Sequence, residues 1–275
     1  MPIIPCRALQ PILLTKQKVP LFKTLISSGL ANGLKLCLDA GDIFSAPSGA
    51  TSWLDQTVNG YDFFRGTTSG AEATDPTFNG MVGNLSKDEY WSFDGGDLFQ
   101  YDSANETWME SIHKAGAKFT ITAWIWVGSA SANGCICGDR GAAAGDTGFV
   151  FNTNATDNLR FNVANAGTSV LTLTTAAAIP AVGQWIFTAM SLDEAVGANG
   201  AILQLNGTKE IFTSTYVAPS AAAASFGLQI GAGGNAFNPF PAASRMGMTA
   251  MWQGVALTAN ELMAIYNATR KRFGV

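Results

Sequence analysis

Two carboxylates flank a pair of glycines in the segment Asp94-Gly-Gly-Asp97. Carboxylate oxygens at a tight turn, with backbone carbonyls beside them, are the ligands that Ca²⁺ prefers, although the ion takes six or more oxygens. The same residues suit a plain turn at the start of a strand, in which aspartate accepts hydrogen bonds from nearby amides. The spacing favours the turn and leaves calcium at Asp94 and Asp97 as the alternative.

Tryptophan rings can stack on the apolar face of a sugar. Trp53 and Trp108 lie among polar residues and are the candidates for an exposed glycan-binding platform; the alternative for each is a half-buried ring that anchors a loop. The other candidates lie in apolar segments, where packing in the core is expected: Trp124, Trp126, Trp185 and Trp252.

Signatures of catalysis are scarce. The sequence has one histidine, His113, which excludes a multi-histidine zinc site. No Ser–acid pattern surrounds His113, so we expect it to be a surface or capping residue and not part of a catalytic triad. Glycoside hydrolysis needs two carboxylates about 5–10 Å apart, which on one strand means acids at alternate positions. No predicted strand carries such a pair. We therefore expect no enzyme activity and no catalytic residues, and a glycoside hydrolase is the least favoured of the candidate functions.

Short strands separated by Gly, Asn and Asp fill most of the chain after residue 36. In residues 119–127, Phe119, Ile121, Ala123, Ile125 and Val127 alternate with Thr and Trp, which predicts a strand. The sequence indicates further strands over residues 148–152, 158–163, 169–174, 184–192, 201–206, 226–231 and 247–253. This spacing is typical of a sandwich or jelly roll.

Two local signals complete the pattern. Asn206-Gly207 is a favourable two-residue hairpin turn. Thr258-Ala-Asn-Glu261 is a capping box, which predicts a helix that Gly274 ends.

Charged residues are distributed unevenly along the chain. Residues 1–35 contain five basic residues and no acid, whereas the rest has eleven basic against 20 acidic residues, a net charge of −9. We interpret residues 1–35 as an extended basic arm that docks on an acidic partner, with a solvated tail as the alternative. The docking candidates are Arg7, Lys16, Lys18 and Lys23. The overall charge of −4 argues against nucleic-acid binding, and no apolar run is long enough for membrane insertion.

Several segments together resemble the concanavalin A-like, laminin-G-like jelly rolls. Tyr90-Trp-Ser-Phe-Asp-Gly-Gly-Asp97 and then Phe119-Thr-Ile-Thr-Ala-Trp124 are similar to the family's entry strands. Its middle hairpin and closing elements are matched by Gly183-Gln-Trp-Ile-Phe187, Ile202-Leu-Gln-Leu-Asn-Gly207, Phe226-Gly-Leu-Gln-Ile-Gly231, Met248-Thr-Ala-Met-Trp252 and Leu257-Thr-Ala-Asn-Glu-Leu-Met-Ala-Ile-Tyr266. The resemblance covers about residues 36–272.

The resemblance implies an all-β sandwich of two antiparallel sheets with a short C-terminal helix over residues 36–275, preceded by the arm of residues 1–35. Members of the family include glucanases, lectins, adhesion modules and bacteriophage virion proteins. The glucanase motif Glu-x-Asp-x-x-Glu is missing, and the family's calcium acids carry over only to Asp94 and Asp97.

The chain looks most like the phage proteins. We expect a virion structural protein, on a capsid, head fibre or tail, that is anchored to other virion proteins through its arm and forms a homo-oligomer. The alternative is a carbohydrate-binding module for attachment to a cell-surface glycan. The expected location is the virion.

Overall fold

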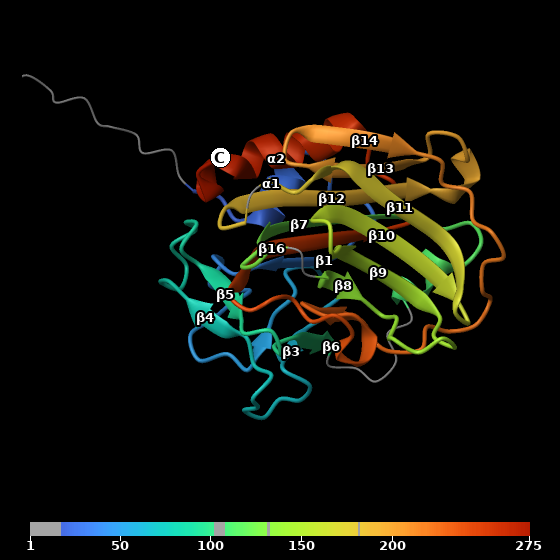
Figure 1. The fold of residues 1–275 in the computed structure, drawn as a ribbon. Helices are drawn as coiled ribbons and strands as arrows, with labels where there is room; N and C mark the ends of the chain where they lie inside the picture. Colours follow the sequence, from blue (N-terminus) through green and yellow to red (C-terminus); the bar gives the residue numbers. More distant parts are fainter. Residues whose placement is uncertain (1–17, 102–107, 131–132, 181) are drawn as a thin grey trace, which may run out of the picture.

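The computed structural model describes residues 18–101, 108–130, 133–180 and 182–275. Within this part the chain forms two antiparallel sheets that pack face to face, with helices on the outer side of one of them (Figure 1).

Sheet A is an eight-stranded sheet within the described residues. Its strands run in the order β14-β13-β12-β7-β16-β5-β4, and β1 also pairs with β16. Their bounds are β1 Leu34–Asp39, β4 Thr77–Asn79, β5 Tyr90–Phe93, β7 Lys118–Trp126, β12 Trp185–Asp193, β13 Ala201–Leu205, β14 Thr208–Phe212 and β16 Ser244–Gln253.

Sheet B also has eight strands in the described part of the chain, in the order β11-β10-β9-β8-β15-β6-β3-β2. Their bounds are β2 Ser52–Trp53, β3 Phe63–Arg65, β6 Phe99–Tyr101, β8 Gly134–Gly138, β9 Gly148–Thr153, β10 Asn158–Asn165, β11 Thr168–Ala178 and β15 Gln229–Ile230.

Two α-helices, α1 (Leu21–Ser27) and α2 (Ala259–Phe273), cover the outer face of sheet A. Three 3₁₀ turns occupy loops: η1 Trp108–His113, η2 Glu194–Val196 and η3 Gly234–Ala236. The capping box predicted at Thr258 and Glu261 is present, and Gly274 ends α2 with a φ of 76°. None of the helices in the described residues is long and apolar enough to cross a membrane.

Strand β7 shows why the alternating pattern forms this sandwich. Phe119, Ile121 and Ile125 lie in the core between the two sheets. Trp124 points to the other side and is buried beneath the helices. Both faces of β7 are therefore buried, because one packs on sheet B and the other lies beneath α1 and α2.

The hairpin predicted at Asn206-Gly207 joins β13 to β14, with Leu205 opposite Thr208. Asn206 has a φ of 50°, the left-handed conformation that Asn tolerates better than most residues. The turn and the cap were thus both correctly predicted from local residue types.

The prediction of an extended arm over residues 1–35 is wrong for its last part. Leu21 and Leu25, one helical turn apart, are buried on α1 against sheet A, and the Nε1 of Trp252 donates to the carbonyl of Leu30 at 2.7 Å. The proposed boundary after residue 35 would cut β1, which begins at Leu34. These residues fold onto the body because the i, i+4 leucine pair buries apolar surface that an extended arm would expose.

Candidate functional site

The predicted tryptophan platform does not exist at the surface. Trp53 is 0% exposed and packs against Trp91 and Phe99, with ring centroids 6.1 and 5.1 Å away. Trp108 is 7% exposed and stacks on Tyr61 at 5.1 Å. Predicting exposed glycan-binding rings at Trp53 and Trp108 was wrong, since polar neighbours in sequence did not prevent either ring from turning into the core.

Asp94 and Asp97 form the turn that the sequence favoured. The Asp94 amide donates to the Asp97 carboxylate at 2.9 Å, and the Gly96 amide donates to Asp94 at 2.8 Å. Burial raises the pKa of Asp97 to about 7. Within the described ranges, no three His, Cys, Asp or Glu side chains are placed to share a metal. Calcium at Asp94 and Asp97 stays a prediction.

The basic docking candidates fall in different places. Arg7 and Lys16 lie outside the described residues. Lys18 donates from Nζ to the carbonyl of Asn84 at 3.2 Å, and Lys23 is exposed on α1. His113, predicted at the surface, is instead fully buried, where its Nε2 lies 2.8 Å from the carbonyl of Ala222. Burial lowers the pKa of His113.

The outer face of sheet B carries a row of polar side chains that sequence reasoning missed. Strand register places Gln100 opposite Gln229, and Asn162 opposite Thr172, on the face that points away from the core. From β3 to β11 the row runs through Phe64, Gln100, Gln229, Gly138, Val150, Asn162 and Thr172, so its polar side chains form two groups that Gly138 and Val150 separate.

A pocket of about 280 Å³ opens at the β6–β15 end of this row. We call it the amide pocket; it is lined by Thr67, Leu98, Gln100, Phe226, Gly227, Gln229, Asn235 and Ala236. Its volume is just below the range for ligand pockets, roughly 300–1,000 Å³.

Two side chains of the amide pocket are fixed by their own hydrogen bonds. Gln229 donates to the Gln100 side-chain oxygen at 3.1 Å and accepts from the Ala236 amide at 2.9 Å. Thr67 donates from its amide and hydroxyl to Glu72 at 3.0 and 2.7 Å. Hydrogen bonds from Thr67 and Thr68 lower the pKa of Glu72 to about 2, so this carboxylate is ionised at neutral pH.

Other polar groups of the amide pocket remain available. Within the described part of the chain, neither the side chain of Asn235 nor the Nε2 of Gln100 has a hydrogen-bond partner in the protein. Asn235 is exposed and has a φ of 55°. A pocket that presents unpaired carboxamide donors and an unpaired carboxamide oxygen suits a ligand with several hydroxyl groups.

An aromatic ring closes one side of the amide pocket. Phe226 is half-buried, and glycines let it pack close to the chain: a methyl group added at Gly141 would lie 2.6 Å from the ring, and one at Gly234 would lie 2.6 Å from its Cβ. Sequence offered one signal for this site, the alternation Leu228-Gln229-Ile230, which puts Gln229 on the face opposite two core residues.

A family profile described as the Concanavalin A-like lectin/glucanases superfamily matches residues 95–263, which is more than half of the chain. The chain therefore belongs to this superfamily. The predicted resemblance and the predicted fold class, a sandwich of two antiparallel sheets with a short C-terminal helix, are confirmed.

Solved structures with similar folds include two from Trypanosoma rangeli. A sialidase in complex with sialic acid has 11% identity and a TM-score of 0.55, over 88% of this chain and 34% of the sialidase chain. A mutant of that sialidase with trans-sialidase activity has 10% identity and a TM-score of 0.55, over 93% and 39%. A structure on the cell entry of botulinum neurotoxin type C, which depends on two ganglioside molecules, has 12% identity and a TM-score of 0.52, over 88% and 53%.

At such identities the likeness shows the fold alone. The chain spans about a third of the length of the sialidases and about half of the neurotoxin chain that it matches. A search of curated protein sequences finds no match to the chain.

The expectation that this chain is not an enzyme was wrong as an inference. It depended on missing carboxylate pairs on single strands, but structures of this fold include sialidases, and the superfamily itself includes glucanases. Absence of one local acid pattern therefore does not separate binding domains from catalytic ones in this superfamily.

Proposed function

We propose that this chain is a carbohydrate-binding domain that holds a sugar residue in the amide pocket. The observation that carries the proposal is the free side chain of Asn235 and the free Nε2 of Gln100, beside the half-buried ring of Phe226. Membership of a lectin/glucanase superfamily supports it, as do similar folds in structures with sialic acid or dependence on gangliosides.

The chemistry of the amide pocket suits a pyranose ring. A carboxamide both donates and accepts, so Asn235 can pair with two neighbouring hydroxyls. The C–H face of the sugar can then pack on the Phe226 ring, which excludes water from the contact. Gln229 accepts from the Ala236 amide and donates to the side-chain oxygen of Gln100. The Gln100 carboxamide is therefore held in one orientation, which directs the Nε2 of Gln100.

A glycan array with the full chain, followed by calorimetric titration of the best ligand, tests the proposal. Asn235→Ala and Phe226→Leu should each weaken binding by roughly tenfold, the effect of one good hydrogen bond or ring contact. Asn199→Ala is the matched control, because Asn199 is also exposed with a positive φ of 62° but lies outside the amide pocket.

Two results would overturn the proposal. If the wild-type chain binds no glycan, the proposed carbohydrate-binding function is wrong. If a glycan binds and both pocket variants bind it as tightly as Asn199→Ala, the amide pocket is the wrong site.

We also propose, as a second candidate, that the chain belongs to a phage virion and is anchored through its basic N-terminal residues. The uneven charge favours it, with no acid in residues 1–35 and a net charge of −9 on the rest. Since residues 20–34 are part of the fold, the deletion that tests anchoring should remove residues 2–17 only. Loss of incorporation into particles is expected, and unchanged incorporation contradicts it.

A further inference from the structure

A second pocket, of about 600 Å³, lies where the last turns of α2 meet the loop between β4 and β5. We call it the basic pocket. Its charged lining consists of Lys18, Lys87, Lys271, Arg272 and a single carboxylate, Asp88. It shares no lining residue with the amide pocket.

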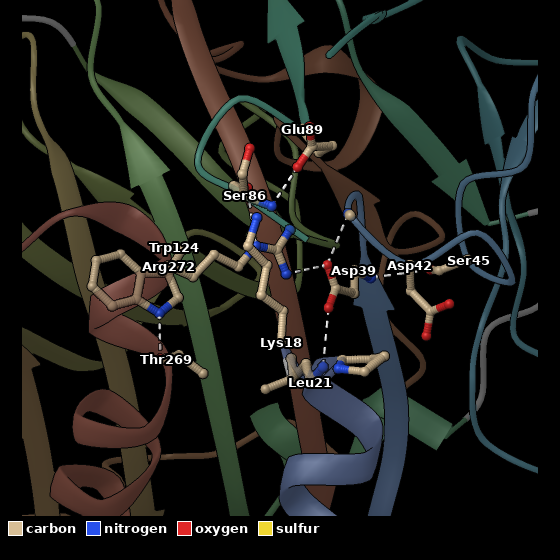
Figure 2. Close-up of polar contacts among 12 residues, drawn as sticks. Lys18, Leu21, Asp39, Asp42, Ser45, Ser86, Glu89, Trp124, Thr269 and Arg272 are labelled. Carbon is tan, nitrogen blue, oxygen red and sulfur yellow. Dashed lines mark hydrogen bonds and ion pairs between the residues drawn. The ribbon is translucent and has the colours of Figure 1, made fainter. Parts of the chain in front are cut away.

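A buried ion pair fixes one wall of the basic pocket (Figure 2). Arg272 donates from Nη1 to the carboxylate of Asp39 at 2.7 Å and from Nε to the carbonyl of Ser86 at 3.1 Å. The side chains of Arg272 and Asp39 are 9% and 0% exposed. The Asp39 carboxylate also accepts from the amides of Leu21 and Gly41 at 3.0 and 2.9 Å, so its own hydrogen-bonding needs are met.

The β4–β5 loop forms the opposite wall, and Glu89 gives that loop its shape. The buried Glu89 carboxylate accepts from the amides of Met81 and Ser86 and from the side chain of Asn84. Although burial opposes ionisation, these hydrogen bonds lower the pKa of Glu89. The loop therefore presents Lys87 from a fixed backbone (Figure 2 shows Glu89 bonded to Ser86, which lies beside Arg272).

The charges that line the basic pocket do not cancel. Asp39 pairs with Arg272, and Asp88 pairs with Lys87 at 2.9 Å. Lys18 and Lys271 have no carboxylate within 4.0 Å among the described residues. Two positive charges are therefore left over at one pocket, on a chain whose overall charge is −4.

The remaining lining includes the apolar side chains of Val19, Leu85 and Met248, together with Thr24, Ser86 and Thr269. Leu85, which has a φ of 53°, is half-buried at this pocket. A small inorganic anion would contact the lysines but leave this apolar surface wet, whereas an anion with an apolar body would cover it.

We propose that the basic pocket binds an organic carboxylate, with its anionic group among Lys18, Lys87 and Lys271 and its apolar body against Leu85 and Met248. This site is independent of the proposed sugar site and of its test.

Titration calorimetry of the full chain with octanoate, octanol, acetate and inorganic phosphate separates the contribution of the charge from that of the apolar body. Octanoate below its micelle concentration should bind more tightly than octanol, which lacks the charge, and more tightly than acetate, which lacks the apolar body. Octanoate binding should also weaken as salt rises from 0.05 to roughly 0.5 M, since salt screens partly exposed lysines.

Variants locate the site. Lys271→Ala and Lys87→Ala should each weaken octanoate binding roughly two- to fivefold, the range for exposed charge pairs. Leu85→Ala should lower the affinity for octanoate and bring it closer to the affinity for acetate. Lys209→Ala, an exposed lysine on β14 outside the pocket, is the matched control and should have no effect.

Three results would overturn the proposal. Equal binding of octanoate and octanol would show that charge is not recognised. Equal binding of octanoate, acetate and inorganic phosphate would show a general charge effect without a shaped site. Pocket variants that behave like Lys209→Ala would place any binding elsewhere.

Discussion

Asp39 and Arg272 are 233 positions apart in sequence and form the most buried ion pair among the described residues. The Asp39 carboxylate joins three elements, because it lies at the end of β1 and accepts from the first residue of α1 and from Arg272 on α2. Removing one partner of such a pair leaves an uncompensated charge in the interior, which costs more than the pair itself contributes.

Asp39→Ala should therefore destabilise the fold strongly. We expect the free energy of unfolding in urea to fall by about 3–5 kcal/mol, since the Arg272 charge stays buried without a partner. Lys118→Ala removes one side of an exposed pair with Asp193, at 2.8 Å and with Lys118 45% exposed, and should cost less than about 1 kcal/mol. Equal losses in the two variants would contradict this account.

Asp97 makes stability depend on pH. Burial raises its pKa from 3.8 to about 7, so the folded state binds a proton more tightly than the unfolded state does. Stability should therefore fall as pH rises between about 4 and 7 and stay level above, by at most about 4 kcal/mol.

Asp97→Asn removes the titrating group and should abolish this part of the pH dependence. The check is urea unfolding at pH 5 and pH 8, with Asp88→Asn as an exposed control that keeps the wild-type fall. An Asp97→Asn variant that loses as much stability as wild type between these two pH values would show that Asp97 is not its source.

At the scale of elements, α2 depends on both its cap and its buried face. Trp124 donates from Nε1 to the hydroxyl of Thr269 at 2.8 Å and stacks on Phe273 with ring centroids 4.4 Å apart. Leu262 and Ile265, on the same side of the helix, are buried against sheet A. The helix thus seals the outer face of β7 and also positions Arg272 at the basic pocket.

Thr258→Ala should weaken α2 at its start. Thr258 and Glu261 satisfy each other's backbone amides, and losing the cap should lower the free energy of unfolding by about 1 kcal/mol. Thr213→Ala, at an exposed threonine, should change it by less than about 0.5 kcal/mol. Chemical denaturation of both variants measures these free energies of unfolding. A Thr258→Ala protein as stable as the Thr213→Ala protein would show that the capping box contributes nothing to stability.

At the scale of the whole molecule, the described residues form a stack of three layers: sheet B, sheet A, and the two helices (Figure 1). Strand β7 lies at the centre of sheet A, between β12 and β16, with both of its faces covered. Strand β14 pairs with β13 alone among the described strands, and its side chains are mostly exposed.

This layering predicts the order of hydrogen exchange. Amides of β7 should exchange slowest, because they are released only by opening of the whole sandwich, whereas those of β14 should exchange by local opening. Exchange followed by mass spectrometry on peptides from the two strands measures the difference. Equal protection of β7 and β14 would contradict a core organised around β7.

Local sequence patterns predicted those structural features that depend on residues close together in the chain. The alternation in β7, the Asn206-Gly207 turn and the Thr258–Glu261 box each involve residues a few positions apart, so their conformations follow from the sequence nearby. The order of such segments also identified the superfamily.

Tertiary structure decided the burial and grouping of residues that are distant in sequence. Trp53 and Trp108 were predicted at the surface, but strands and loops far along the chain cover them. Gln100 and Asn235 line the same pocket because β6 pairs with β15, which sets Gln100 opposite Gln229, and because Gln229 accepts from the Ala236 amide of η3. By itself the sequence determined most of the longer strands, the turn, the cap and the superfamily. Only the packing of the sheets and helices decided which side chains form the two pockets, because that depends on contacts between distant segments.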